Sequence, residues 1–329
     1  MRNVDEKLYL PAGAAGDGPF SLVVTPERAG WAYSGLRVLE LAPGQAHTWA
    51  TGSEESLVLP LSGSAVVTCE GPVSRSTGSR STGSRSTTGS QTEVFELQGR
   101  RDVFSRVSDF CYVPRDATVT VGSADGGTFA IPSARCANQL PPRYGPAEEV
   151  PVELRGAGQA SRQVNNFCSP DTFECDKLIA VEVLTPGGNW SSYPPHKHDL
   201  SRPGEEAELE EIYYFVSRGL GYQRVYGTAD RPLDVLAEVG TGDVVLVPHG
   251  WHGPSIAAPG YDLYYLNVMA GPAAERAWLF CDDPAHAWIR GTWRDQAVDP
   301  RLPMTSATES TQQAREAHDE AKRGQRPYL

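Results

Sequence analysis

The chain has 329 residues, 29 of them basic and 41 acidic, and its formal net charge is -12 at neutral pH. No basic block stands outside one Ser/Arg/Thr/Gly tract, which argues against a surface for nucleic acids or anionic membranes. No apolar run approaches the roughly 18 residues of a membrane helix, and the charged N-terminus lacks the apolar stretch of a signal peptide. The six cysteines are scattered without a C-x-x-C pair. We therefore expect a cytoplasmic protein with reduced thiols.

Short segments rich in β-branched and aromatic residues dominate the chain, each bounded by Gly, Pro, Ser or Asp. In chain order, the predicted strands are 56–69, 102–114, 117–121, 178–184, 211–216, 222–226, 243–248 and 261–269. No amphipathic helix of any length precedes residue 270, and residues 309–323 fit either a polar helix or a frayed tail. The pattern predicts an all-β protein.

Residues 74–90 read SRSTGSRSTGSRSTTGS, close to a tandem repeat. The tract has no large apolar residue, so burial cannot offset the entropy lost on ordering it. Because it stands between two strand-like runs, we interpret it as a disordered expansion of a hairpin loop rather than a segment that binds an acidic ligand.

The two halves of the chain share an order of features. The first contains LRVLELAPG, SLVLPLSGSAVV and DFCYVPRDATVTV; the second contains IAVEVLTPGG, EEIYYFVSRGLGYQRVY and GDVVLVPHGWHGPS. Each shows a strand with a Pro-Gly turn, paired strands, and a strand that ends in Val-Pro. This repetition predicts one all-β unit used twice, as two β-sandwich domains that meet near the Pro-rich residues 140–150.

Four of the seven histidines lie within 57 residues of the second half. His196 and His198 alternate in an extended segment, so both imidazoles face the same side. Glu211 begins a predicted strand, and His249 and His252 follow the end of another. Three neutral imidazoles and one carboxylate are a ligand set for Zn, Fe, Mn, Co or Ni, with positions left open for water or substrate. We expect the other histidines to be structural or solvated; they are His47, His286 and His318.

This pattern resembles the double motif of the cupins: two His and a Glu on one segment, then Gly, Asp, Pro and His on the next. Within the cupins, YPPHKHD, EEIYYF, QRVY, GDVVLVPHGWHGP and PGYDLYYLNVMAGP are similar to the 5-deoxyglucuronate isomerase family of inositol catabolism, to which the 4-deoxy-5-ketouronate isomerases are related. The likeness covers most of the chain, and its specific motifs lie between residues 190 and 272.

The resemblance implies a bicupin, two jelly-roll β-barrel domains in tandem. We assign 1–145 to an N-terminal barrel, 146–300 to a metal-binding C-terminal barrel, and 301–329 to a short polar tail. The N-terminal barrel has PRDAT where the second has PHGWH, and only His47 where the second has HKH. It therefore lacks the residues for the same metal site, and we expect it to be structural or to form an interface.

The resemblance also implies one divalent metal, which we expect to be Zn, held by His196, His198, Glu211 and His252. Glu210 and Glu211 are adjacent, and only one can face the barrel interior. We prefer Glu211, since Tyr213 and Phe215 then share its face, although the long acidic spacer after His198 leaves a slip of one residue open. His252 is preferred to His249 because it falls where the motif places its ligand.

The implied reaction is an aldose–ketose interconversion of 5-deoxy-D-glucuronate and 2-deoxy-5-keto-D-gluconate. A guanidinium can bind the substrate carboxylate, and Arg224 is the candidate. Tyr265 and Asn267 are candidates to bind sugar hydroxyls, and Trp251 to form an apolar wall against the ring. The candidate proton carriers, which the sequence does not rank, are Glu210, Lys197, Tyr213 and His249.

Two other functions fit the same motifs. A cupin dioxygenase also uses a three-His, one-Glu site, with Fe(II) and O₂. A non-catalytic sugar-binding bicupin would use its metal only to hold the barrel together. We expect a small sugar acid as the substrate, and the resemblance implies a homo-oligomer.

Overall fold

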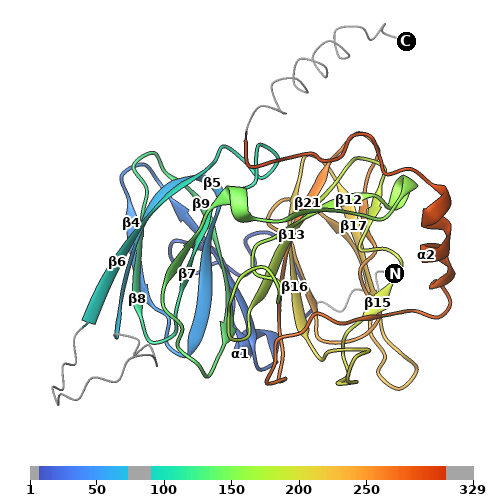
Figure 1. Cartoon of the computed structure of the whole chain (residues 1–329), viewed down its shortest axis with the longest axis horizontal. Coiled ribbons are helices and arrows are strands. Elements are labelled where there is room, and N and C mark those ends of the chain that lie inside the picture. Colours follow the sequence, from blue (N-terminus) through green and yellow to red (C-terminus); the bar gives the residue numbers. More distant parts are fainter. Residues whose placement is uncertain (1–6, 73–89, 309–329) are drawn as a thin grey trace, which may run out of the picture.

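The computed structural model describes residues 7–72 and 90–308 (Figure 1). Within these ranges, no helix is both long and apolar enough to span a membrane. The tract predicted as a loop expansion lies outside the described residues, apart from its last residue, and so does the predicted helix or tail at 309–323.

The first half of the described chain folds into antiparallel strands at the blue end of the molecule (Figure 1). The central path of its sheet runs β10-β7-β5-β9-β3-β2, and the long strand β5 also pairs with β6 and β8. A one-turn helix, α1 (Pro26–Ala29), follows β2. The strands are β2 (Phe20–Val24), β3 (Ser34–Leu41), β4 (Ala46–Ala50), β5 (Glu54–Pro72), β6 (Ser90–Arg100), β7 (Phe110–Val113), β8 (Thr118–Gly122), β9 (Gly127–Arg135) and β10 (Arg143–Gly145).

The second half forms a sheet of order β1-β19-β16-β21-β13-β12-β11 and a smaller one of order β14-β20-β17-β18. A two-stranded ribbon of β15 and β22 adjoins them, and α2 (Trp288–Thr292) lies at the outer end (Figure 1). The strands are β1 (Tyr9–Leu10), β11 (Val152–Arg155), β12 (Arg162–Asn166), β13 (Ile179–Thr185), β14 (Trp190–Ser191), β15 (His196–Lys197), β16 (Glu210–Ser217), β17 (Gly221–Tyr226), β18 (Asp234–Val239), β19 (Val244–Val247), β20 (Ser255–Ala257), β21 (Leu263–Ala270) and β22 (Cys281–Asp282).

Strand alternation divides the apolar side chains into three cores. One fills the N-terminal barrel and includes Val58 and Phe129, and a second fills the C-terminal barrel and includes Tyr213 and Phe215. The third lies between the two large sheets, to which β16 contributes Ile212 and other residues of the opposite face. Both large sheets are therefore buried on both faces, and β16 has one face toward the C-terminal interior and one toward the other half.

Buried charges join the two halves as well. Arg100 donates to both carboxylate oxygens of Glu182, at 3.0 and 2.7 Å, and neither side chain is exposed. Glu182 also accepts from Asn165 Nδ2 at 2.7 Å. In addition, Glu55 on β5 accepts from the backbone N–H groups of Lys177 and Leu178, at 2.6 and 2.8 Å. Because a buried charge needs a partner, these contacts tie each half to the other.

Both ends of the described chain also reach across the molecule. β1 pairs with β19, so the first strand belongs to the second sheet although it lies within the range predicted for the N-terminal barrel. Toward the other end, Leu302 and Thr305 are buried, and Gln163 Nε2 donates to the Thr305 carbonyl at 2.9 Å. The first residues of the predicted tail are thus packed.

The predicted all-β class is confirmed, and every predicted strand region contains an observed strand. The region 102–114 is shorter than predicted, because only β7 within it is extended; Ser105 N–H donates to the Asp102 carbonyl and closes a turn before it. β12 is a strand that the sequence pattern did not predict. It borders β11 and β13 and becomes important at the site.

Candidate metal centre

Three imidazoles meet in the C-terminal barrel. His196 begins β15 and His198 follows it, while His252 lies in the turn between β19 and β20. The backbones of His196 and His252 exchange two hydrogen bonds, of 2.9 and 2.8 Å, which bring the two segments together. One nitrogen from each of the three rings lies within 4.8 Å of the others. The predicted histidine cluster is therefore present, and these three side chains can bind a metal ion.

The outer nitrogens of the rings are occupied by backbone carbonyls. Nδ1 of His198 lies 3.1 Å from the Leu209 carbonyl, and Nδ1 of His252 lies 2.8 Å from the Gly250 carbonyl. A carbonyl only accepts, so each Nδ1 carries the proton and each Nε2 presents a lone pair. The two Nε2 atoms are 3.0 Å apart. Two facing lone pairs repel each other unless a proton or a metal ion lies beside them, and this orientation is typical of metal-binding histidines.

Glu211 completes the group from the start of β16. One of its carboxylate oxygens, Oε2, lies 3.1 Å from His198 Nε2 and 2.9 Å from His252 Nε2. Burial raises its pKa, but the imidazoles of His198 and His252 beside it outweigh burial and hold the pKa well below its usual range. The pKa of His196 is well below its usual value because of burial and the two neighbouring imidazoles. A neutral imidazole beside an ionised carboxylate fits a divalent cation.

Glu210 points the opposite way. Its carboxylate accepts from the backbone N–H groups of Ala32, Tyr33 and Ser34, at 2.7, 2.8 and 2.8 Å, on the N-terminal half. Strand alternation explains the difference, because neighbouring residues of β16 face opposite sides of the sheet. The structure thus places Glu211 rather than Glu210 among the imidazoles and corrects the expectation that Glu210 carries a proton there.

Lys197 is also directed away from the imidazoles, as expected for the residue between two histidines of an extended segment. Its ammonium group donates to Asp199 Oδ1 at 2.6 Å and to Glu206 Oε1 at 2.7 Å, and it lies 5.5 Å from the centre of the Trp251 ring. Burial lowers the pKa of Lys197, but the two carboxylates outweigh it and raise the pKa. Lys197 is therefore held as a cation, and Trp251 stacks on it; both placements differ from the roles expected from the sequence.

Arg224 lies on the outer face of β17. The buried residues of this strand are Gln223 and Val225, whereas Arg224 alternates with them. Its guanidinium forms an ion pair with Asp234 on β18 and donates to the Val235 carbonyl at 3.0 Å. The structure thus corrects the expectation that Arg224 faces the substrate.

Three other predicted residues line the interior on the face of Glu211. The Tyr213 ring centre lies 6.3 Å from that of His252 and 5.2 Å from that of Tyr265. Asn267 pairs with Tyr213 across β16 and β21, and its Nδ2 is buried without a hydrogen-bond partner in the described part of the chain. Burial and the charge of Glu211 raise the pKa of Tyr213 well above its usual value, so its hydroxyl stays protonated.

His249 lies three residues before His252, outside the three-histidine cluster. Burial, with a contribution from Arg231, lowers its pKa. Its Nδ1 is buried and has no hydrogen-bond partner within the described residues. A role for His249 stays a prediction.

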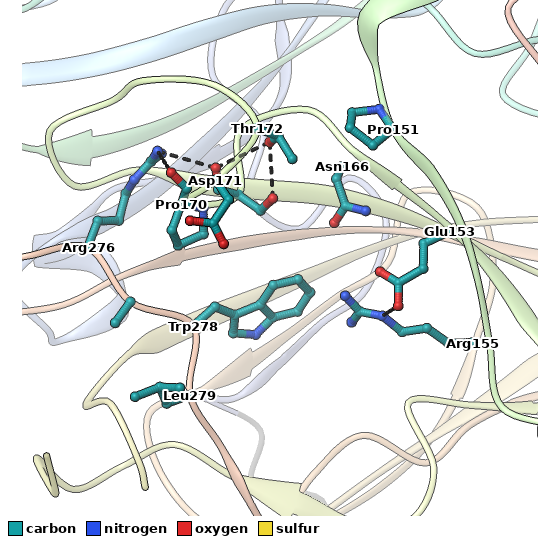
Figure 2. A pocket seen from close by; sticks show the side chains of 12 residues that line it. Pro151, Glu153, Arg155, Asn166, Pro170, Asp171, Thr172, Arg276, Trp278 and Leu279 are labelled. Carbon is teal, nitrogen blue, oxygen red and sulfur yellow. Dashed lines mark hydrogen bonds and ion pairs between the residues drawn. The ribbon is translucent and has the colours of Figure 1, made fainter. Parts of the chain in front are cut away.

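Two cavities adjoin the edge of this barrel along β11 and β12. One, of about 650 Å³, is lined by Asn166, Arg276 and Trp278 among others, and Figure 2 shows Trp278 between Arg276 and the Glu153–Arg155 ion pair. The other, of about 410 Å³, shares that pair and Trp278 with the first. It is also lined by Arg162, Phe280, Arg290 and Trp293.

Phe280 in the wall of the second cavity also packs against the histidine cluster, since its ring centre lies 4.8 Å from that of His196. The ribbon of β15 and β22 explains this contact, because His196 pairs there with Asp282. The sequence reasoning did not identify Phe280 or Arg162. Neither belongs to a recognisable motif, and only the pairing of distant strands brings them to the site.

Comparison with known proteins gives a consistent result. Residues 8–289 match the KduI/IolB family. The chain is 40% identical over 288 residues to the 5-deoxy-glucuronate isomerase of Geobacillus kaustophilus, covering 86% of this chain and 95% of that protein. It is 36% identical over 271 residues to the 5-deoxy-glucuronate isomerase of Bacillus subtilis, covering 81% and 91%.

Solved structures support the same architecture. An IolB-like protein from Salmonella typhimurium superposes with a TM-score of 0.73 at 32% identity, covering 86% of this chain and 98% of that one. Oxalate decarboxylase from Lactobacillus farciminis superposes with a TM-score of 0.57 at 13% identity, covering 84% and 88%, a likeness of fold alone. The predicted bicupin fold is confirmed.

Proposed function

Because the chain belongs to the KduI/IolB family, we propose that it is a 5-deoxy-glucuronate isomerase of inositol catabolism, converting 5-deoxy-D-glucuronate into 2-deoxy-5-keto-D-gluconate. The observation that carries this proposal is the set of relatives of that name, aligned along most of the chain at 40% and 36% identity. The reaction turns the aldehyde into a hydroxymethyl group and the neighbouring alcohol into a ketone. A hydrogen must therefore move between adjacent carbons.

The proposal includes one divalent ion, Zn²⁺, held by His196, His198, His252 and Glu211. Mn, Fe, Co and Ni share the donor preferences of this set. Support comes from the Nε2 lone pairs that face one another and from the ionised carboxylate beside them. An ion held by these four residues would supply a Lewis acid beside the substrate oxygens.

The other side chains of the interior would orient the substrate. Tyr213 has a protonated hydroxyl, which suits donation of a hydrogen bond or a proton to a substrate oxygen rather than removal of one. Asn267 Nδ2 is a buried donor that a sugar hydroxyl would satisfy. The Tyr265 hydroxyl donates to Ser191 Oγ at 2.9 Å and lies 2.8 Å from Ser192 Oγ, an arrangement that fixes its ring in the wall.

No observation on the described residues favours a dioxygenase or a non-catalytic sugar-binding protein over the isomerase. The likeness to oxalate decarboxylase extends to the fold alone. A cytoplasmic location and a homo-oligomer remain part of the proposal.

The test is NMR of 5-deoxy-D-glucuronate incubated with the purified protein without oxygen, in D₂O, before and after chelation. We expect ketose to form and chelation to stop it. Deuterium in the product would indicate an enediol route, and its absence a direct hydride shift. A metal-loaded protein that leaves the substrate unchanged contradicts the proposed reaction. Consumption of oxygen with the same sugar would support the dioxygenase instead.

A further inference from the structure

Strand β12 carries an arginine into the C-terminal barrel. Gln163 and Asn165 point toward the layer between the two halves and contact Thr305 and Glu182. Side chains alternate along a strand, so Arg162 and Val164 face the opposite side. Val164 belongs to the core that fills this barrel. Arg162 therefore enters the same interior as the histidine cluster.

Within the described residues, no carboxylate lies close enough to Arg162 to form an ion pair. The residue is 6% exposed, and its one direct hydrogen bond in the described chain runs from Nη1 to the Ala160 carbonyl at 3.2 Å. It forms no ion pair with any described residue. By contrast, the neighbouring arginines are paired, Arg155 with Glu153 and Arg290 with Asp282. A buried guanidinium without a counter-ion is costly, which makes this position a site for an anion.

The surroundings of Arg162 reinforce this reading. Burial, together with the positive charges of Arg155 and Arg290, outweighs the opposing effects of Tyr265 and Glu153 and lowers its pKa to about 10. A group that is still protonated at neutral pH but destabilised by its surroundings gains most from a bound carboxylate. Figure 2 shows Arg155 held against Glu153, so its charge is already compensated. Arg162 is therefore the free cation among these three.

The cavity beside Arg162 lies next to the histidine cluster, with Phe280 between them. Arg162 and Phe280 both line it, and Phe280 packs against His196. In 5-deoxy-D-glucuronate, the carboxylate and the reacting aldehyde lie at opposite ends of the molecule. A substrate of this kind needs an anion-binding group set apart from the metal cluster, and Arg162 lies in a cavity whose wall residue Phe280 packs against His196.

We propose that Arg162 binds the carboxylate of the sugar acid and so selects uronates over neutral sugars. This inference rests on the proposed isomerase function, for which it names the specificity-determining residue. The planar fork of a guanidinium matches a carboxylate through two parallel hydrogen bonds. The carboxylate would hold the far end of the substrate while the aldehyde reaches the histidine cluster.

The experiment compares wild type, Arg162→Gln and Arg162→Lys on 5-deoxy-D-glucuronate and on its primary amide, with bound metal and thermal unfolding measured for each. Arg162→Gln should raise KM for the acid about 100-fold, equivalent to about 2.7 kcal/mol, with a much smaller change in kcat. The wild-type preference for the acid over the amide should disappear in this variant. Arg162→Lys keeps the positive charge but loses the planar fork, so KM for the acid should rise about tenfold.

The control is Arg294→Gln, because Arg294 is close in sequence to Trp293 of the cavity wall but 83% exposed, paired with Asp295. It should leave KM and the acid preference unchanged. An active wild type with unchanged acid preference in both Arg162 variants overturns this inference and leaves the isomerase standing. A metal-loaded wild type without turnover overturns both. If Arg162→Gln does not fold, the acid preference of Arg162→Lys decides: an unchanged preference refutes the proposal.

Discussion

Glu210 and Glu211 are neighbours in the chain but face opposite sides of β16. Substituting each one separately therefore distinguishes an effect on folding stability from an effect on activity. Glu211→Gln removes the negative charge beside His198 and His252. Loss of a residue that merely supports a ligand typically costs 10–100-fold, so loss of a ligand should lower activity at least roughly 100-fold. Bound metal should fall with it.

Glu210→Ala should act on folding instead. The Glu210 carboxylate accepts three backbone N–H groups, from Ala32, Tyr33 and Ser34. Hydrogen bonds to a charged group contribute about 1.5–3 kcal/mol each when buried. Because this carboxylate is only half-buried, we expect a total loss of about 2–4 kcal/mol in the free energy of unfolding. The midpoint of thermal unfolding should then fall by roughly 4–10 °C.

The two variants serve as controls for each other. Metal per chain is measured by mass spectrometry, turnover by NMR, and stability by calorimetry. We expect Glu210→Ala to retain metal and kcat at a temperature where it is folded, and Glu211→Gln to lose both. If Glu210→Ala loses its metal while its unfolding midpoint stays unchanged, the assignment of the two faces of β16 is refuted.

Further predictions concern the interface, the metal, the interior and the acid range. Arg100→Met leaves Glu182 buried without its partner, so urea denaturation should show the free energy of unfolding lowered by about 3–5 kcal/mol. Adding Glu182→Leu should restore most of it. A loss that persists in the double variant contradicts this prediction. Chelation should abolish turnover and Zn²⁺ should restore it; full activity in metal-free protein would refute the metal proposal. Tyr213→Phe should lower kcat about 10–100-fold with bound metal unchanged. The carboxyl of Asp299 has its pKa lowered from 3.8 to about 2, chiefly by Arg301, so it stabilises the fold above its ordinary pKa and loses this effect as the pH falls toward 2. Asp299→Asn should therefore lower the unfolding midpoint at about pH 6 and clearly less at about pH 3; an equal loss at both would exclude a charge effect.

The part of the site that rests on strand alternation could be predicted from the sequence. His196 and His198 are two residues apart, and so are Glu211 and Tyr213. Because side chains two residues apart in a strand share a face, the sequence alone favoured Glu211 over Glu210. Alternation also sets the direction of the Arg224 side chain, but the sequence does not show which face of β17 is inward. That face became clear only from the buried positions Gln223 and Val225.

The contacts between distant segments could not be predicted. Arg162 and Phe280 line one cavity because of the strands that pair with β12 and β22, and nothing local in the sequence indicates those pairings. The pairing of β1 with β19 has the same cause. The repeat of two similar halves predicts two barrels, but it does not predict that a strand from the first half joins the sheet of the second.

The apolar layer between the two large sheets affects how much folded protein accumulates in a cell. Neither barrel can be cut away without exposing one full apolar sheet face, so an isolated catalytic half would aggregate. The two barrels should also unfold together. A substitution in that layer would then reduce the abundance of the protein rather than its turnover, and genetic screens for loss of activity would find positions far from the histidine cluster.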